Sequence, residues 1–190
     1  MRKALLVFLP LLLLSCARKE DLPVNLNTSA GVVSPNGRYT IGKETFGSRK
    51  PVLKRTGNHV CYIKDNKTGN MQKLFGYDRY ATVLWSRNGE RFLTNNYEGS
   101  NISNCYLYYY EGEWKCDDVW QKLKGGGGYD EVFELSHLYI EGQKWEGDNA
   151  VVLRVKGHAG EKIKTYEAFF KCKISDGKLA FECLRQRTKR

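Results

Sequence analysis

The chain has 190 residues, of which 41% are hydrophobic and 13% aromatic, and its 31 Lys and Arg against 21 Asp and Glu give a formal net charge of +10. This composition excludes an intrinsically disordered chain, and the lack of an apolar run of about 18 residues excludes a protein that crosses a membrane several times. We expect one folded domain behind a short leader.

The leader is expected to occupy residues 1–15. Two basic residues, Arg2 and Lys3, precede an apolar run at residues 4–14. A helix of that length cannot cross a hydrocarbon core of about 30 Å, so the run is typical of an export signal rather than of a membrane anchor.

Residues 13–16 read Leu-Leu-Ser-Cys and resemble the lipobox of bacterial lipoproteins. The resemblance implies cleavage before Cys16 and acylation of that cysteine, which attaches the chain to a membrane through lipid. In that family an Asp after the cysteine retains the protein in the inner membrane, so Ala17 implies the outer membrane, facing the periplasm. Residues 16–33 are polar and are predicted to be the lipidated N-terminus and a linker.

The domain proper, residues 34–190, begins with a pattern that recurs. Residues 34–39 read Ser-Pro-Asn-Gly-Arg-Tyr, and residues 85–92 repeat a Ser-x-Asn-Gly turn before an apolar strand. An Asn-Gly turn beside apolar residues is a strong hairpin signal. With the strand and Lys-Thr-Gly turn at residues 60–69, the pattern resembles the blade repeat of TolB and related PD40-type β-propellers. A fainter third copy starts at residue 145.

The remaining segments also favour strands. Two or three units are fewer than the 4 to 8 blades of typical propellers. We therefore expect an all-β, antiparallel fold, either a propeller-like fragment of two to three blades or an open twisted β assembly. One helix is predicted at residues 129–138, where apolar residues recur at every third position. Strands are predicted at residues 39–41, 60–63, 81–85, 92–94, 106–110, 150–155 and 166–170.

Five cysteines follow Cys16. Cys105 and Cys116 flank one predicted hairpin and Cys172 and Cys183 another, so two local disulfides are expected in an oxidising periplasm, with Cys61 left over. Each bridge requires a strand register that places both sulfurs on one face. No C-x-x-C pair is present, which disfavours a metal site.

The sequence predicts no catalytic, cofactor-binding or metal-binding residue. His59, His137 and His158 lack a metal-ligand spacing, and no Gly-x-Ser-x-Gly motif is present. The glycine run at residues 125–128 is not followed by the Lys-Ser/Thr pair of a nucleotide-binding loop.

An aromatic stripe is the candidate binding face. Alternation along a strand places Tyr106, Tyr108 and Tyr110 on one face and Leu107 and Tyr109 on the other. If the second face is buried, the three tyrosines form an exposed contact surface for protein or sugar. In the alternative, neighbouring units cover both faces. Tyr97 and Asn101 are expected in the polar rim.

Basic residues gather at residues 49–55 and 185–190. Such runs usually form a solvated surface, and the alternative is docking onto anionic lipid or an acidic target. Export makes nucleic acid an unlikely partner.

Three functions compete at this point. The features favour a lipid-anchored, non-enzymatic lipoprotein that binds a protein in the periplasm, with an immunity protein or inhibitor of a periplasmic toxin or hydrolase as the alternative. An envelope glycan hydrolase comes third. Its carboxylates would be Asp117 with Asp118 or Asp130 with Glu131, but adjacent acids on a strand point to opposite faces.

Overall fold

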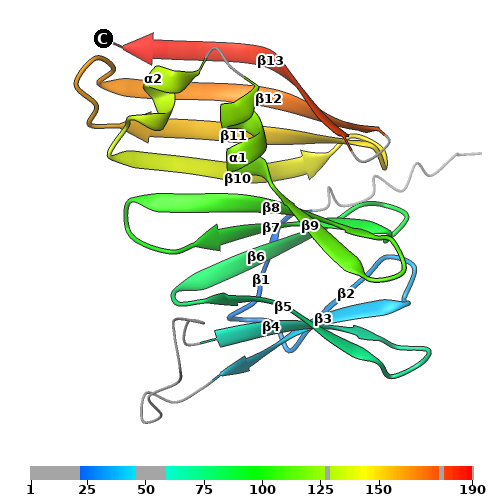
Figure 1. Cartoon of the computed structure of the whole chain (residues 1–190). Coiled ribbons are helices and arrows are strands. Elements are labelled where there is room, and N and C mark those ends of the chain that lie inside the picture. The colour runs from blue at the N-terminus through cyan, green and yellow to red at the C-terminus, as the bar shows by residue number, and fades with distance from the viewer. Residues whose placement is uncertain (1–21, 46–58, 127–128, 176–177, 190) are drawn as a thin grey trace, which may run out of the picture.

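The computed structural model describes residues 22–45, 59–126, 129–175 and 178–189. The predicted leader, Cys16 and the basic segment 49–55 lie outside these residues. Strands dominate the described part, with two short helices on one side of it (Figure 1).

The strands form two sheets, one with the order β2-β3-β4-β5 and one with the order β1-β6-β7-β8-β10-β11-β12-β13, in which β9 also pairs with β8. The elements are β1 (Val24–Asn25), β2 (Val32–Val33), β3 (Tyr39–Thr45), β4 (His59–Asp65), β5 (Met71–Tyr77), β6 (Tyr80–Trp85), β7 (Arg91–Tyr97), β8 (Ile102–Tyr110), β9 (Trp114–Asp118), α1 (Val119–Gly125), α2 (Asp130–Phe133), β10 (His137–Trp145), β11 (Ala150–His158), β12 (Thr165–Ser175) and β13 (Lys178–Lys189).

Three antiparallel units follow one another along the chain. The first is β2 to β5, the second β6 to β9 and the third β10 to β13. Figure 1 shows them in this order from the bottom of the view to the top. A short parallel pairing of β8 with β10 joins the second and third units. The sheets stay open, which confirms the expected all-β, antiparallel, open twisted assembly.

The second unit is buried on both faces. Phe92 and Tyr108, opposite each other on β7 and β8, stack at 4.6 Å in a core shared with the first unit. Their neighbours Leu93 and Leu107 point the other way, into a core shared with the third unit and the two helices. Successive side chains of a strand alternate between faces, so one strand pair supplies both cores.

Two side-chain amides join the units. Gln72 of the first unit donates to the Trp114 carbonyl at 2.8 Å and accepts from the Trp114 N–H at 2.9 Å. Asn95 of the second unit donates to the Gly142 carbonyl at 3.1 Å and accepts from the Gly142 N–H at 2.7 Å. Each amide satisfies both backbone hydrogen-bonding groups of one residue in the next unit, which aligns the units.

The recurring Ser-x-Asn-Gly segments form turns of the same construction. In residues 34–38 and 86–90 the serine hydroxyl donates to the asparagine Oδ1, at 2.7 and 2.8 Å. The same oxygen accepts the N–H two residues later, at 3.0 Å in both turns. The glycines have φ of +72° and +71°, a conformation that costs glycine little. The sequence repeat is thus also a repeat of local structure.

One turn from each unit lies at the same end of the molecule, which we call the turn end. Asn36 Nδ2 donates to the Asn88 carbonyl at 2.8 Å, and the Asn88 N–H donates to Asp148 Oδ1 at 2.9 Å. Arg91 Nη1 also donates to the Asp148 carbonyl at 3.0 Å. The three turns are therefore joined in a row, and this row positions the loops beside it.

The domain begins earlier than expected. Val24 pairs with Val83 in β1 and β6, and Leu26 is only 1% exposed. The Leu26 N–H donates to the Ala81 carbonyl at 2.9 Å. The predicted linker 16–33 is therefore wrong for its last ten residues, because a few apolar side chains among polar ones are enough to hold this segment on the sheet.

The helix prediction was also wrong in its extent. Only Asp130–Phe133 of the predicted helix 129–138 is helical, because strand β10 begins at residue 137. The three apolar residues on which the prediction was based, Val132, Leu135 and Leu138, are all buried. They lie, respectively, in α2, in the segment after it and in β10. Helix α1, Val119–Gly125, was not predicted. Its signal is Asp118, which caps the helix by accepting the Gln121 N–H at 3.0 Å.

A comparison of Gly89→Ala with Gly37→Ala tests the row of turns. Both changes place a side chain at positive φ, which costs roughly 1 to 2 kcal/mol. Only at Gly89 would the new Cβ also lie 2.7 Å from Asn36 Cγ, whereas at Gly37 it would meet nothing within 4 Å. We expect Gly89→Ala to lower the free energy of unfolding, measured by urea denaturation, clearly more than Gly37→Ala. Equal losses would show that contact between the turns is energetically unimportant.

Candidate binding groove at the turn end

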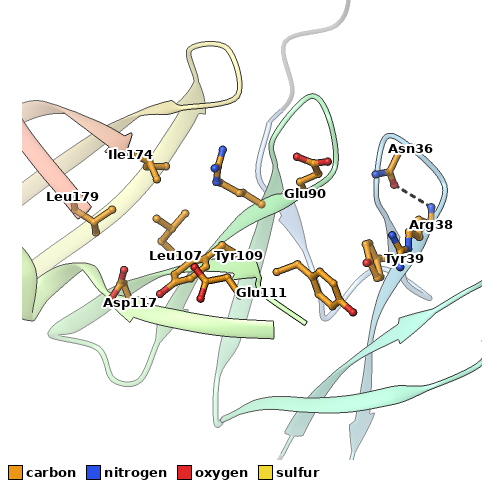
Figure 2. A pocket seen from close by; sticks show the side chains of 12 residues that line it. Asn36, Arg38, Tyr39, Glu90, Leu107, Tyr109, Glu111, Asp117, Ile174 and Leu179 are labelled. Carbon is orange, nitrogen blue, oxygen red and sulfur yellow. Dashed lines mark hydrogen bonds between the residues drawn. The ribbon is translucent and has the colours of Figure 1, made fainter. Parts of the chain in front are cut away.

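Two adjoining hollows of about 310 Å³ each open at the turn end. The first lies between the second and third units and the second lies between the first unit and the β8–β9 hairpin. They share Arg38, Tyr39 and Tyr110, and we call the pair the turn-end groove. Figure 2 shows the first hollow, with side chains from all three units around it.

An aromatic cluster forms the base of the groove. Tyr39 and Trp114 are nearly buried, and their rings meet edge to face at 5.0 Å. Tyr110 contacts both rings, at 6.0 and 5.6 Å, yet is 43% exposed. Edge-to-face contacts of this kind hold a ring in place. Tyr110 is thus an exposed ring on a rigid base, between the two hollows.

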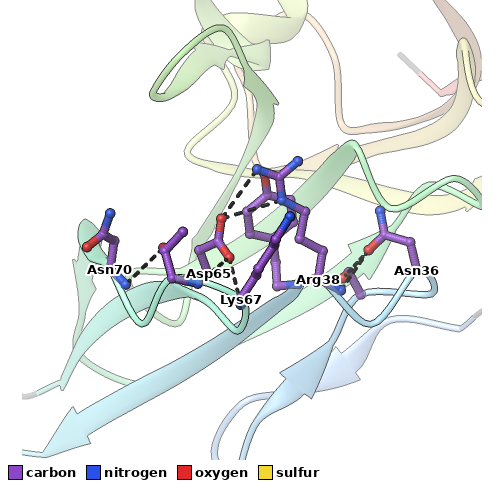
Figure 3. Close-up of polar contacts among 8 residues, drawn as sticks. Asn36, Arg38, Asp65, Lys67 and Asn70 are labelled. Carbon is purple, nitrogen blue, oxygen red and sulfur yellow. Dashed lines mark hydrogen bonds and ion pairs between the residues drawn. The ribbon is translucent and has the colours of Figure 1, made fainter.

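Arg38 lies beside this ring. Its guanidinium is 4.9 Å from the centre of the Tyr39 ring and 5.7 Å from that of Tyr110. Its Nη2 is 3.3 Å from Asp65 Oδ2, and Figure 3 shows this ion pair bridging the turns of the first unit. The cation is therefore oriented from both sides, by rings and by a carboxylate.

Asp65 is stabilised in its charged form. Burial by itself would raise the pKa of its carboxyl, but the Lys67 and Thr68 N–H groups, which donate at 2.8 and 3.2 Å, and the Arg38 guanidinium outweigh it and hold the pKa below its usual value. The ion pair with Arg38 thus persists at neutral pH.

The first hollow presents carboxylates. Glu90, Glu111 and Asp117 line it, and each already has a partner. Glu111 pairs with Lys115 at 3.1 Å and Asp117 with Lys122 at 3.3 Å, while Glu90 accepts from an asparagine amide. These lysine partners are half exposed, so a basic group of a ligand can replace them without leaving a buried charge unpaired.

Of the four carboxylates considered for glycan hydrolysis, the structure places Asp117 alone in the groove. Asp117 lies opposite Leu107 and lines the groove, whereas Asp118 lies opposite Tyr106 and caps α1. Asp130 and Glu131 belong to the first turn of α2 and together line a different hollow of about 550 Å³.

The exposed tyrosine stripe is not formed. Alternation does place Tyr106, Tyr108 and Tyr110 on one face of β8, but the first unit covers that face. Tyr108 is 3% exposed and stacks on Phe92, and Tyr106 is partly buried. Only Tyr110, at the end of the strand, extends beyond the covering sheet.

Tyr97 and Asn101 lie away from the groove. Tyr97 stacks on Tyr80 at 3.9 Å and donates to Glu141 at 3.0 Å. Asn101 immediately precedes β8, so nine residues of strand, about 30 Å, separate it from Tyr110. The sequence patterns did not identify Arg38, Tyr39 or Trp114 as site residues. The repeated Ser-x-Asn-Gly turn was a signal for the first two, because it directly precedes them.

Cys105 and Cys116 are free thiols, and the expected disulfide between them is absent. Cys116 lies opposite Tyr108, three residues from Cys105. An odd separation places the two sulfurs on opposite faces of the sheet, with Cys105 buried and Cys116 exposed.

Cys172 and Cys183 are also free. Cys172 lies opposite Phe181, and Cys183 lies opposite Phe170. The two cysteines are therefore diagonal neighbours, at roughly 7 to 8 Å between Cα atoms, beyond the usual span of a disulfide. Cys61, the predicted odd cysteine, is likewise free and is buried.

Within the ranges that the structure describes, no group of three or more His, Cys, Asp and Glu side chains is placed to hold a metal ion. No helix in those ranges is long and apolar enough to cross a membrane. Comparison of the chain with models of protein families, with curated proteins and with solved structures finds no match.

Asp65→Asn is expected to lower the melting temperature at pH 7, because it removes the ion pair with Arg38. A carboxyl with a lowered pKa stabilises the fold above its unfolded pKa, near 3.9, and this contribution is lost as the pH falls through the folded pKa. The difference between wild type and variant should therefore shrink in acid, as measured by thermal denaturation from pH 7 to pH 2. The control is Glu161→Gln, which removes one negative charge from an exposed position outside the groove. A difference that does not depend on pH would contradict the role of the ion pair.

Thiol labelling tests the cysteine assignment. Burial raises the pKa of the Cys61 and Cys172 thiols to about 12. We expect a maleimide to label the exposed Cys116 and Cys183 rapidly in the folded protein, and the three buried cysteines only after unfolding, with the sites read by mass spectrometry. A peptide linking two of these cysteines, found without reduction, would contradict the free-thiol assignment.

Proposed function

We propose that this chain is a non-enzymatic lipoprotein of the bacterial envelope, held through Cys16 to the outer membrane and facing the periplasm, that binds a protein partner in the turn-end groove. The observation that supports binding is Tyr110, an exposed ring fixed on buried aromatic residues between two hollows. The anchor is supported by residues 13–16 of the sequence.

The composition of the groove suits a protein partner. Tyrosine, tryptophan and arginine are enriched among the residues that carry most of the energy of protein interfaces. Tyr110 and Arg38 are already held by contacts with Tyr39 and Trp114 or Asp65. Little side-chain freedom is therefore lost when a partner binds.

The shape of the groove suits an extended segment. The hollows continue on either side of Tyr110, so a bound segment would cross the ring and enter both. In the first hollow, Glu90, Glu111 and Asp117 would receive a basic side chain, and in the second, Asn70 and other polar side chains would contact the backbone. Such charge placement contributes to partner selection.

Affinity capture with Tyr110→Ala tests this function. Residues 17–190 contain every element described here and serve as bait in envelope extract of the native strain. We expect wild type to retain one protein in stoichiometric amount and Tyr110→Ala to lose affinity for it by about tenfold or more, because a fixed central tyrosine is a typical hot spot. Tyr80→Ala is the matched control, since Tyr80 is similarly exposed but packs on Tyr97 away from the groove.

A crosslinkable p-benzoylphenylalanine at position 110 makes the test independent of affinity, and it should attach to the same partner. If that partner is a toxin or hydrolase, the chain is its inhibitor, which is the alternative within the same binding class. Retention unchanged by Tyr110→Ala, or hydrolysis of an envelope polymer by the purified chain, would contradict the proposal.

A further inference from the structure

The outer face of the third unit carries a concentration of positive charge. Its inner face lies in the core beneath α1 and α2, which cover the same side of β10 to β13 in Figure 1. The strand registers place the alternate residues of these strands on the opposite, uncovered side. We call this side the basic face, and its charged side chains are Lys144, Arg154, Lys156, Lys171, Lys173, Lys178, Arg185, Arg187 and Lys189 with Glu141, Glu146, Glu167 and Glu182.

Nine cations against four carboxylates give the basic face a formal net charge of +5, half of the +10 of the whole chain. The carboxylates are already engaged. Glu167 pairs with Arg154 at 2.6 Å, Glu146 with Lys171 at 2.7 Å and Glu182 with Lys173 at 2.9 Å, and Glu141 accepts from a tyrosine hydroxyl. The excess of positive charge is therefore directed toward solvent.

Cations also cover the aromatic residues of the face. Lys156 Nζ lies 5.1 Å from the centre of the Tyr139 ring, and the Arg185 guanidinium lies 4.0 Å from that of Phe169. The rings of Tyr139 and Phe169 are thus each covered by a cation. Protein interfaces are built around an apolar centre from which lysine is depleted, so this pattern does not favour a protein partner.

The charges are spread over an area rather than gathered in a pocket. They come from β10 to β13, and β13 alone extends about 36 Å as the outer strand of the sheet. A broad, evenly basic surface matches a planar array of anionic headgroups, where each Lys or Arg adds to binding without a complementary contour.

We propose that the basic face docks on anionic phospholipid headgroups of the membrane and so orients the domain on the bilayer. This inference rests on the proposed envelope location but uses neither Cys16 nor the turn-end groove. Docking would hold the domain in one orientation, so that the groove is presented to the partner at a constant angle to the membrane.

Vesicle sedimentation of residues 17–190, which lack the anchor, tests the proposal. The vesicles are phosphatidylcholine alone or with about a quarter phosphatidylglycerol, at ionic strengths of about 0.1 M and 1 M, where the screening length falls from about 10 to 3 Å. We expect binding only with phosphatidylglycerol and loss of binding at high salt. The triple change Arg185→Gln, Arg187→Gln and Lys189→Gln should lower the partition coefficient on the order of 100-fold.

Two further variants test whether the loss of vesicle binding is specific to the basic face. Lys156→Gln with Lys178→Gln changes the same face without touching the Arg185–Phe169 contact, and should also weaken binding. Lys64→Gln, Lys67→Gln and Lys73→Gln remove the same charge as the first triple change from exposed positions of the first unit, and should leave most binding intact. Circular dichroism verifies that every variant is folded.

No binding to phosphatidylglycerol vesicles, or an equal loss in the first-unit control, would overturn the docking proposal. It would also be overturned if the wild-type protein did not bind vesicles but captured an acidic protein that the basic-face variant failed to retain. Tyr110→Ala should bind vesicles as wild type does, so failure of the groove proposal and failure of this one are distinguishable.

Discussion

The structure depends on the burial of the second unit from both sides. The pair Phe92 and Tyr108 packs in one core and the pair Leu93 and Leu107 in the other, so the second unit contributes side chains to both cores. Hydrophobic burial does not by itself fix the orientation of one unit relative to the next. The orientation is set by Gln72 and Asn95, whose side-chain amides each form two hydrogen bonds with the backbone of a single residue in the next unit. Packing brings the units together and these bonds set their alignment.

That alignment explains where the groove lies. With the units held in register, the turns at residues 34–38, 86–90 and 146–149 meet at one end, and the β8–β9 hairpin is fixed against the first unit by Gln72. The hollows form between these loops because turns are too short to fill the space between separate units. Binding residues on loops held by a rigid scaffold are a common arrangement, and here the scaffold also fixes Tyr110.

The two outermost sheet faces meet a different requirement. A stack of units leaves one sheet face at each end that no other unit covers. Such a face must be polar if the protein is to remain in solution. The third unit meets this requirement with nine cations and four carboxylates, and three of the carboxylates pair with cations of the same face. The long edge strand β13 carries several of these charges, which also discourages pairing with another sheet. The same residues thus account for solubility and provide a surface that anionic headgroups can meet.

The sequence by itself predicted seven of the strands, namely β3, β4, β6, β7, β8, β11 and β12, with the Asn-Gly turns and their repeat, because alternation and turn chemistry depend on neighbouring residues. It missed β1, β2 and β5, and it predicted the start of β10 as helix. Only the tertiary structure decided that Tyr108 is buried while Tyr110 is exposed, since a sheet more than 30 residues earlier in the chain covers one and not the other. The meeting of Arg38 with Tyr110 likewise depends on the packing of segments that are distant in the sequence. A local pattern shows which face a side chain takes, but not what covers that face.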